Sequence, residues 1–191
     1  GFGTAGGAGL PGYDLVVQAA SGLMSLTGDP DGQAYRSGVS VFDIMTGMQA
    51  TIGILAALNH RTATGLGQHV EVNLLSTALA AMANHSSTYV AGGKVPFRMG
   101  NAHPSLFPYE PLPASDGEIV IVAANDPQFR KLATALDRPD LLDDERFATT
   151  EGRNVNREQL RPLLVDALST KTIAEWFEIL SDAGIACGPI N

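Results

Sequence analysis

Residues 42–61 read FDIMTGMQATIGILAALNHR, and this stretch decides how the first half of the chain is interpreted. Its apolar side chains recur every three or four positions, which is the spacing of one face of a helix. That face comprises Ile44, Met48, Ile52, Leu55 and Leu58. The stretch therefore predicts a long, mostly buried helix, and the glycines at 65 and 67 are typical of its end.

The regions on either side of this helix have weaker patterns. Apolar residues at helical spacing predict a helix over 13–25, and a second helix is expected over 76–90. Between the long helix and the second one, residues 69–74 alternate in polarity, which predicts a strand. The segment 28–38 is rich in Gly, Asp and Pro and is expected to be a loop.

The second half of the chain alternates strands and helices. Residues 118–123 (EIVIVA) predict a strand, and Asp126-Pro127 is expected to begin a helix, with Asp126 as its N-cap. A further helix is expected over 156–168. The sequence Thr172-Ile173-Ala174-Glu175 is a capping box, which predicts a helix that ends near Gly184. The whole pattern indicates an α/β or α+β class.

Charge divides the chain into two parts. Of the 32 Lys, Arg, Asp and Glu residues in the 191-residue sequence, only eight lie in residues 1–97. A segment so poor in charge cannot cover itself with a polar surface, so it is expected to pack against other sequence or another subunit. We place the boundary in the Gly- and Pro-containing stretch 91–96, which gives domains of residues 1–97 and 98–191.

Composition excludes several classes of function. The net charge of −8 argues against nucleic acid or an anionic membrane as a partner. The most apolar stretch, 44–58, is too short for a membrane span. A single cysteine, Cys187, fits a reducing compartment, and a cytoplasmic location is expected. The four histidines lie in different predicted elements without ligand spacing, so no metal site is expected.

Two motifs have a structural and a functional interpretation. Residues 1–6 (GFGTAG) match a dinucleotide-binding pattern, but no strand precedes it and glycines follow it, so a flexible loop is favoured. Asp43 is the only carboxylate between Asp31 and Glu71. It is either a helix cap or a nucleophile, and as a nucleophile it would lie beside free first-turn amides that can stabilise an oxyanion. Gly47, one turn later, either allows close helix packing or lets a ligand approach the backbone. The residues alone leave both alternatives open.

An ordered series of motifs along the chain resembles the class III CoA transferases, the formyl-CoA transferase type. The resemblance covers nearly the whole chain, and its specificity comes from the order and spacing of the motifs. They are Gly1-Phe2-Gly3, Gly12-Tyr13-Asp14, Ser21-Gly22-Leu23-Met24, Gly38-Val39, Asp43-Ile44-Met45-Thr46-Gly47, Gly53-Ile54-Leu55-Ala56-Ala57-Leu58, His60-Arg61, Thr64-Gly65-Leu66-Gly67-Gln68, Met99-Gly100-Asn101-Ala102-His103-Pro104, Ala114-Ser115-Asp116-Gly117, Arg146-Phe147 and Gly184-Ile185-Ala186-Cys187-Gly188-Pro189-Ile190.

This resemblance implies a fold and an assembly. Residues 1–97 would be the inner part of a Rossmann-like large domain and residues 98–191 most of a small α+β domain. The chain would be an internal fragment, because members of the family are about twice as long. They form interlocked homodimers, and the fragment alone is expected to be inactive.

The resemblance also implies a reaction. Asp43 matches the family's catalytic aspartate, which attacks an acyl-CoA thioester and carries CoA to a carboxylic acid through covalent aspartyl intermediates. An apolar setting is expected to shield Asp43 from water, which would hydrolyse those intermediates. Coenzyme A enters as the acyl-CoA substrate, no metal is required, and Gly12 and Tyr13 are expected to contact the CoA thioester arm.

Two alternatives remain at this point. The related α-methylacyl-CoA racemases use the same aspartate as a base together with a histidine, and Tyr13 stands at the position of that histidine. Since a phenol is a poor base at pH 7, this difference favours transfer over racemisation. The racemases also have a glutamate at a position resembling Asp126, for which an N-cap role is favoured here. The third interpretation is a non-catalytic assembly fragment.

Overall fold

The computed structural model describes residues 1–4 and 7–191. The GFGTAG motif, for which a loop is expected, lies partly outside the described residues. The chain divides into two compact units, residues 1–100 and 101–191.

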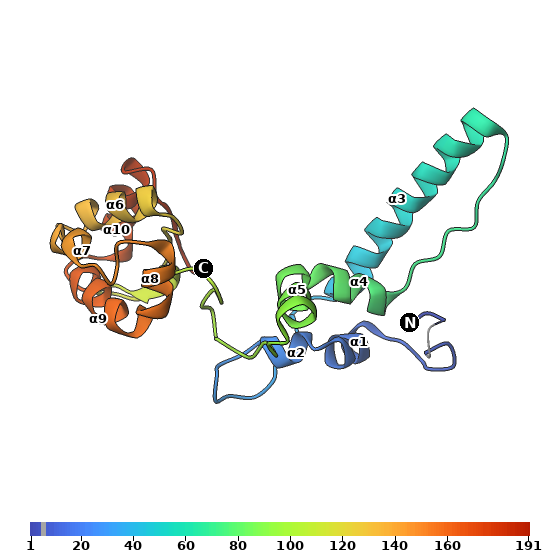
Figure 1. Ribbon diagram of the computed structural model, residues 1–191, viewed down its shortest axis with the longest axis horizontal. Coiled ribbons are helices and arrows are strands. Elements are labelled where there is room, and N and C mark those ends of the chain that lie inside the picture. The colour runs from blue at the N-terminus through green and yellow to red at the C-terminus, as the bar shows by residue number, and fades with distance from the viewer. Residues whose placement is uncertain (5–6) are drawn as a thin grey trace. The chain divides into compact units, whose positions relative to one another are not determined.

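Among the described residues of the first unit, all regular secondary structure is helical, and loops join the helices. A two-helix N-terminal segment precedes one long helix, and two further helices follow (Figure 1). Their bounds are α1 Asp14–Ser21, α2 Leu23–Leu26, α3 Val41–Thr64, α4 Leu74–Ala81 and α5 Ala83–Gly92. The core is small and lies where α1, α4 and the first turn of α3 meet. It is formed by Val17, Phe42, Leu74 and Ala78.

The long helix α3 is present where the sequence predicts it, but it is not mostly buried in this chain. Phe42 is its only buried residue. Exposed apolar side chains line the rest of the helix, including all five of the residues whose spacing predicts it: Ile44, Met48, Ile52, Leu55 and Leu58. Beyond its first turns α3 extends away from α4 and α5 within this unit (Figure 1). The apolar pattern therefore marks a face that this chain leaves open.

Residues 66–73, which return from the end of α3, form no strand. The predicted strand at 69–74 is therefore wrong, because alternation of polarity yields a strand only where a neighbouring strand supplies hydrogen bonds. The segment has no regular structure and passes close to α3. A Cβ added at Gly53 of α3 would lie 2.7 Å from Cγ1 of Val70.

The second unit consists of a three-stranded antiparallel sheet with five helices. The sheet order is β1-β2-β3, with Tyr109 opposite Val122 and Ile121 opposite Cys187. The strands are β1 Tyr109–Pro113, β2 Glu118–Val122 and β3 Ala186–Pro189. The helices are α6 Asp126–Ala135, α7 Asp140–Asp143, α8 Thr150–Val155, α9 Arg157–Leu168 and α10 Ile173–Asp182.

This unit has a core of its own. Alternate residues of β1 and β2 are buried, and they pack with the buried faces of α6, α9 and α10. The predicted capping box begins α10: the Thr172 hydroxyl accepts from the Glu175 amide, and the Glu175 carboxylate accepts from the Thr172 amide at 2.9 Å. The mixed helix and strand content confirms the predicted α/β class.

Candidate active site at the start of helix α3

Asp14 is the first residue of α1, and its side chain is hydrogen-bonded to the first turn of α3. It is buried, and its Oδ1 accepts hydrogen bonds from the amides of Phe42 at 2.8 Å and Asp43 at 3.2 Å. Ser40, the residue at the N-cap of α3, makes no side-chain capping bond within the described chain. The helix is therefore capped by a side chain that lies 28 residues earlier in the sequence.

Gln18 extends this junction into the loop before α3. Its side chain is fully buried and donates to the second oxygen of Asp14. Its Oε1 accepts from the amide of Ser37 at 2.8 Å, and its Nε2 donates to the carbonyl of Val39 at 3.4 Å. One pair of side chains thus fixes α1, the 37–39 loop and the start of α3 to one another.

Asp43 lies on the outside of this junction. Its backbone amide is bonded to Asp14, but the residue is exposed, and no hydrogen bond or ion pair of its carboxylate occurs among the described residues. The expectation that an apolar setting shields Asp43 from water is therefore wrong for this chain. The helical start places the carboxylate at a surface of the first unit, whose own residues do not shield it.

The first-turn amides of α3 are not free, which corrects the expected oxyanion role. The amides of Phe42 and Asp43 bond to Asp14, that of Val41 bonds to the carbonyl of Val39, and that of Ile44 to the carbonyl of Ser40. The alternative that Asp43 caps its own helix also fails, because Asp14 makes the capping bonds.

Gly12 and Tyr13 immediately precede Asp14, so the junction brings them to the same end of α3 as Asp43. Tyr13 is the N-cap residue of α1 and its side chain is 75% exposed. A Cβ at Gly12 would lie 2.3 Å from the Cα of Gly1, so glycine is required there for the close approach of two backbone segments. The three predicted site residues therefore lie around one helix end.

The first unit also contains an apolar pocket of about 570 Å³ between α1–α2 and α4–α5. Ser21, Ser25, His85 and Tyr89 contribute polar groups to its wall, and the rest is mainly apolar. None of Gly12, Tyr13 or Asp43 lines it. The pocket is thus a feature separate from the predicted catalytic residue.

In the second unit Asp126 has a structural partner. The N-cap of α6 is Asn125, whose side chain accepts from the amide of Gln128, so the predicted N-cap is one residue out. Asp126 instead pairs with Arg153 at 2.7 Å, and this hydrogen bond lowers the pKa of the Asp126 carboxyl. Arg153 is fully buried, lies over the ring of Phe129, and also donates to the carbonyl of Phe147.

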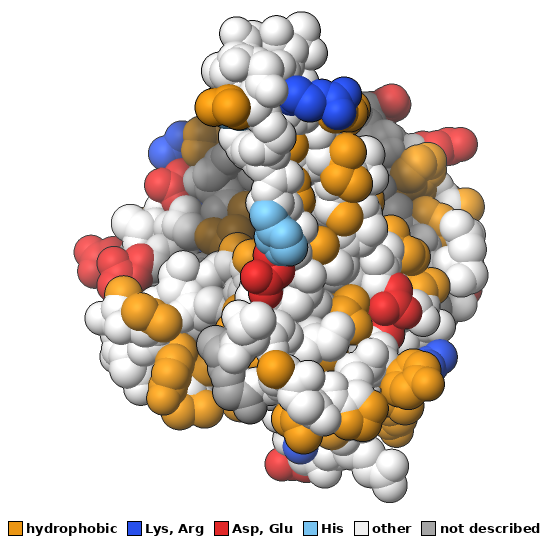
Figure 2. Space-filling model, turned by 90° about the vertical axis from the view of Figure 1, so that its right-hand side faces the viewer, with side chains coloured by type: hydrophobic (Ala, Val, Ile, Leu, Met, Phe, Trp, Pro, Cys, Tyr) orange, Lys and Arg blue, Asp and Glu red, His pale blue; other side chains and the backbone are white. Residues whose placement is uncertain are grey.

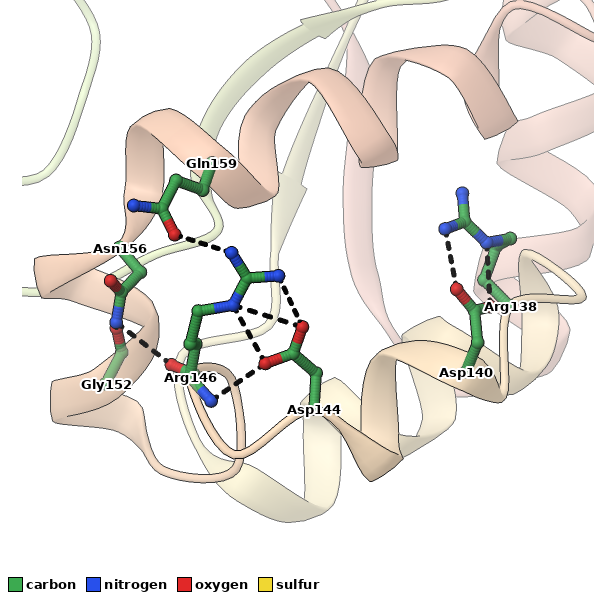
Figure 3. A network of polar contacts seen from close by, with 7 residues as sticks. All are labelled: Arg138, Asp140, Asp144, Arg146, Gly152, Asn156 and Gln159. Atoms are coloured by element: carbon green, nitrogen blue, oxygen red, sulfur yellow. Dashed lines mark hydrogen bonds and ion pairs between the residues drawn. The ribbon is translucent and has the colours of Figure 1, made fainter.

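Further ion pairs lie on the surface of this unit. Figure 3 shows Arg146 between Asp144 and Gln159, and Arg138 beside Asp140. Hydrogen bonds from Arg146 lower the pKa of Asp144, and one from Arg138 lowers the pKa of Asp140. Such exposed pairs fix local loop geometry and contribute little to stability.

Glu110 is the buried carboxylate of the sheet. Burial raises its pKa, while the neighbouring Arg161 on α9 opposes that rise. Within the described residues no group of three His, Cys, Asp or Glu side chains is arranged to hold a metal ion. Helix α3 is long and apolar enough to cross a membrane by length and composition alone, so the expectation that its apolar stretch is too short is wrong on length; core helices of soluble proteins also pass this test.

Three residues of these networks were not predicted from the sequence: Asp14, Gln18 and Arg153. Asp14 had one signal, its place in the Gly12-Tyr13-Asp14 motif, but its partner lies on another helix. Gln18 and Arg153 had none, because burial of a polar side chain is decided by tertiary contacts.

The fold and the site together define an α/β protein with a solvent-facing aspartate at a capped helix end. Comparison with known proteins identifies the family: residues 1–191 match CoA-transferase family III over their whole length, and the chain belongs to it. It is 40% identical over 197 residues to the succinate–glutarate CoA-transferase of Agrobacterium fabrum, and 38% identical over 192 residues to the acetyl-CoA:oxalate CoA-transferase of Acetobacter aceti. Both alignments cover 100% of this chain, but 48% and 49% of the relatives.

Solved structures show the same relationship. A CAIB/BAIF family protein from Brucella suis is 42% identical with a TM-score of 0.78, over 100% of this chain and 51% of that one. Rv3272 from Mycobacterium tuberculosis is 30% identical with a TM-score of 0.84, over 97% and 50%. The chain thus spans about half the length of the relatives it matches.

Proposed function

We propose that this chain is the part of a CoA transferase that carries the nucleophile, and that Asp43 moves CoA between two carboxylic acids through covalent aspartyl intermediates. Family membership supports CoA transfer in general. The observation that carries the assignment to Asp43 is its geometry: the backbone is held through its amide while the carboxylate is unpaired among the described residues and open to a substrate.

The proposed reaction moves one negative charge back and forth. An oxygen of Asp43 attacks the thioester carbonyl, the C–S bond breaks, and the electron pair leaves with the CoA thiolate. The thiolate then attacks the Asp43 carbonyl of the anhydride, releasing the donor acid and leaving an aspartyl-CoA thioester. The acceptor carboxylate attacks that thioester and expels the thiolate, which gives a second anhydride between Asp43 and the acceptor. The thiolate then attacks the acceptor carbonyl, and the C–O bond to Asp43 breaks, which releases the new acyl-CoA and restores the Asp43 carboxylate. An anhydride retains the reactivity of the thioester, so no step is strongly downhill.

Both intermediates react with water, so the exposed Asp43 of this chain must be covered in the active protein. The open apolar face of α3 begins at Ile44, the next residue, and offers the surface for such a cover. We propose that further sequence and a second subunit of a homodimer supply this cover. We also propose that the protein acts in the cytoplasm. Residues 1–191 alone are then expected to be inactive.

The substrates follow from chemistry and from relatives. Related proteins are named for transfer among succinate, glutarate, oxalate and mesaconate, and we propose a short dicarboxylic acid as the acceptor here. Tyr13 is exposed beside the helix end, so the Gly12-Tyr13 segment is proposed to contact the thioester arm of CoA. No nucleic acid, membrane or metal takes part in this proposal.

Racemisation has less support. It requires a second acid–base group near Asp43, and Tyr13 is a weak base at neutral pH. Asp126, which resembles the second acidic residue of the racemases in position, is held in an ion pair with the buried Arg153. Neither residue is available for proton transfer in the way racemisation needs.

Trapping the intermediate tests the proposal. Full-length protein incubated with succinyl-CoA and hydroxylamine should acquire a hydroxamate that peptide mass mapping places on Asp43. Asp43→Asn should lower kcat by about 1,000-fold or more, as expected for loss of a covalent nucleophile. Asp31→Asn, which removes another exposed carboxylate of the same unit, is the matched control and should leave kcat unchanged. Modification elsewhere, or an active Asp43→Asn variant, would refute the assignment.

A further inference from the structure

The buried carboxylate of Asp14 has the hydrogen-bonding pattern of an ionised group. Its two oxygens accept from three N–H donors: the amides of Phe42 and Asp43, and the side chain of Gln18. No basic side chain pairs with it among the described residues. A negative charge is therefore placed directly against the first turn of α3, beside the backbone of the nucleophile.

This arrangement changes what the helix end does to Asp43. Uncapped amides in a first turn attract anions, and an aspartate side chain at that position readily folds back to accept their hydrogen bonds. A carboxylate so bonded is stabilised in its ground state and becomes a weaker nucleophile. Asp14 occupies those amides, and the Asp43 carboxylate has no bond within the described chain.

The charge of Asp14 also favours acylation in a direct way. When Asp43 attacks a thioester, its negative charge passes to the departing sulfur. Repulsion between Asp14 and Asp43 is present before the attack and is relieved once Asp43 is acylated. The repulsion raises the free energy of the charged Asp43 carboxylate but not that of the neutral anhydride, so it lowers the barrier to acylation.

We infer that Asp14, held by Gln18, is the positioning residue for Asp43: its oxygen occupies the amides that would otherwise bind the Asp43 carboxylate, and its negative charge beside the nucleophile favours acylation. This inference rests on the proposed covalent role of Asp43. It adds a second aspartate to the reaction without placing that aspartate in contact with substrate.

A charge exchange between Asp14 and Gln18 separates positioning from simple capping. In Asp14→Asn the side-chain oxygen still accepts from Phe42 and Asp43, but its new NH₂ group faces the NH₂ group of Gln18. Adding Gln18→Glu removes this conflict, because the carboxylate introduced at position 18 accepts from both the new NH₂ group and the Ser37 amide. The double variant keeps the net charge and all of these hydrogen bonds except the donation from position 18 to the carbonyl of Val39, and it moves the negative charge away from the first turn of α3.

The measurement is the single-turnover rate of hydroxylamine-trapped acylation in full-length protein with succinyl-CoA, beside the KM and the melting temperature. We expect Asp14→Asn to lower the acylation rate about tenfold or more, with KM changed less than about threefold, as for loss of an interaction specific to the transition state. The double variant should recover most of the melting temperature while its acylation rate stays low. A wild-type acylation rate in either folded variant overturns the inference.

Hydrogen exchange gives a test that does not depend on the folding of a variant. In the wild-type protein the amides of Phe42 and Asp43 should be protected, and fast exchange at both overturns the inference. The proposed function fails separately: if Asp43→Asn is active, Asp43 is not the nucleophile, whatever Asp14 does. If Asp43→Asn is inactive and both Asp14 variants acylate normally, only the positioning role of Asp14 is lost.

Discussion

Gly47 lies on the exposed surface of α3, one turn after Asp43, and a Cβ there would meet no atom within 4 Å. Glycine in a helix interior costs about 0.5–1 kcal/mol relative to alanine. Gly47→Ala should therefore stabilise residues 1–191 by about that amount. If substrate approaches the helix backbone beside Asp43, the added methyl group should lower kcat/KM of full-length protein about tenfold or more, by blocking a close contact.

Thermal unfolding and steady-state kinetics of the two forms measure the two effects of Gly47→Ala separately. The control is Gly92→Ala at the end of α5, where a Cβ also meets no atom within 4 Å and no substrate is proposed. Its kcat/KM should match the wild type. Unchanged kcat/KM in Gly47→Ala would show that the glycine is not needed for substrate approach.

Residues differ in how far the sequence reveals their roles. Asp43 is identifiable because it is an isolated charge at the start of an apolar stretch, a pattern that is local. Its exposure is not predictable, since shielding depends on tertiary contacts that no local pattern encodes. The capping role of Asp14 depends on a contact across 28 positions, and no local pattern encodes it. For the same reason the sequence predicts Asp126 as an N-cap, whereas its partner Arg153 lies 27 positions away.

At the scale of elements, the Asp126–Arg153 pair ties the first turn of α6 to α8. Arg153 is fully buried whereas the Asp126 side chain is 40% exposed. Removing the exposed partner leaves a buried positive charge uncompensated, but removing the buried arginine leaves an aspartate that water can solvate. Asp126→Ala should therefore destabilise the second unit more than Arg153→Met, although the arginine makes more contacts. Urea unfolding of both variants measures the order.

The same pair predicts a dependence on pH. Because Arg153 lowers the pKa of Asp126 below its ordinary value of 3.8, the stabilisation is fully present above that value and is lost as pH falls through the lowered pKa. The difference in unfolding free energy between wild type and Asp126→Ala should be constant near pH 7 and should shrink below about pH 4. A difference that stays constant down to about pH 2 would show that Asp126 acts through packing instead of charge.

Elements with local signals were predicted and those with non-local ones were not. The capping box of α10 and the β-branched run of β2 contain their signals within a few residues. Strand β1 was missed because Pro111 and Pro113 argue against a strand, and they are tolerated only because β1 is an edge of the sheet. The expected strand at 69–74 failed for the opposite reason, since its pattern was correct but no neighbouring strand lies beside it in the described chain.

At the scale of the whole molecule, the two units differ in how many charged and apolar side chains they expose to solvent. The second unit encloses its core, and the sequence after residue 100 holds 15 acidic and 8 basic residues. The first unit has five acidic and four basic residues, a small core, and a long helix whose apolar side chains are open. Figure 2 shows hydrophobic side chains spread over the face on which this helix lies. Patches of this kind mark protein interfaces.

We therefore expect residues 1–191 to associate in solution through α3. Met48 and Ile52 are 61% and 67% exposed and lie one turn apart on the helix. Burial of one such side chain is worth about 2 kcal/mol. Replacing Ile52 by Lys should weaken association by about 30-fold, and adding Met48→Lys should weaken it further.

Val155→Lys, which replaces a 74% exposed apolar residue of the second unit, is the control and should have no effect on association. Sedimentation velocity over a range of concentrations measures these changes. A well-folded monomer of residues 1–191 at high concentration would mean that the α3 face needs no cover, and the proposal that a second subunit or further sequence shields Asp43 would lose its physical basis.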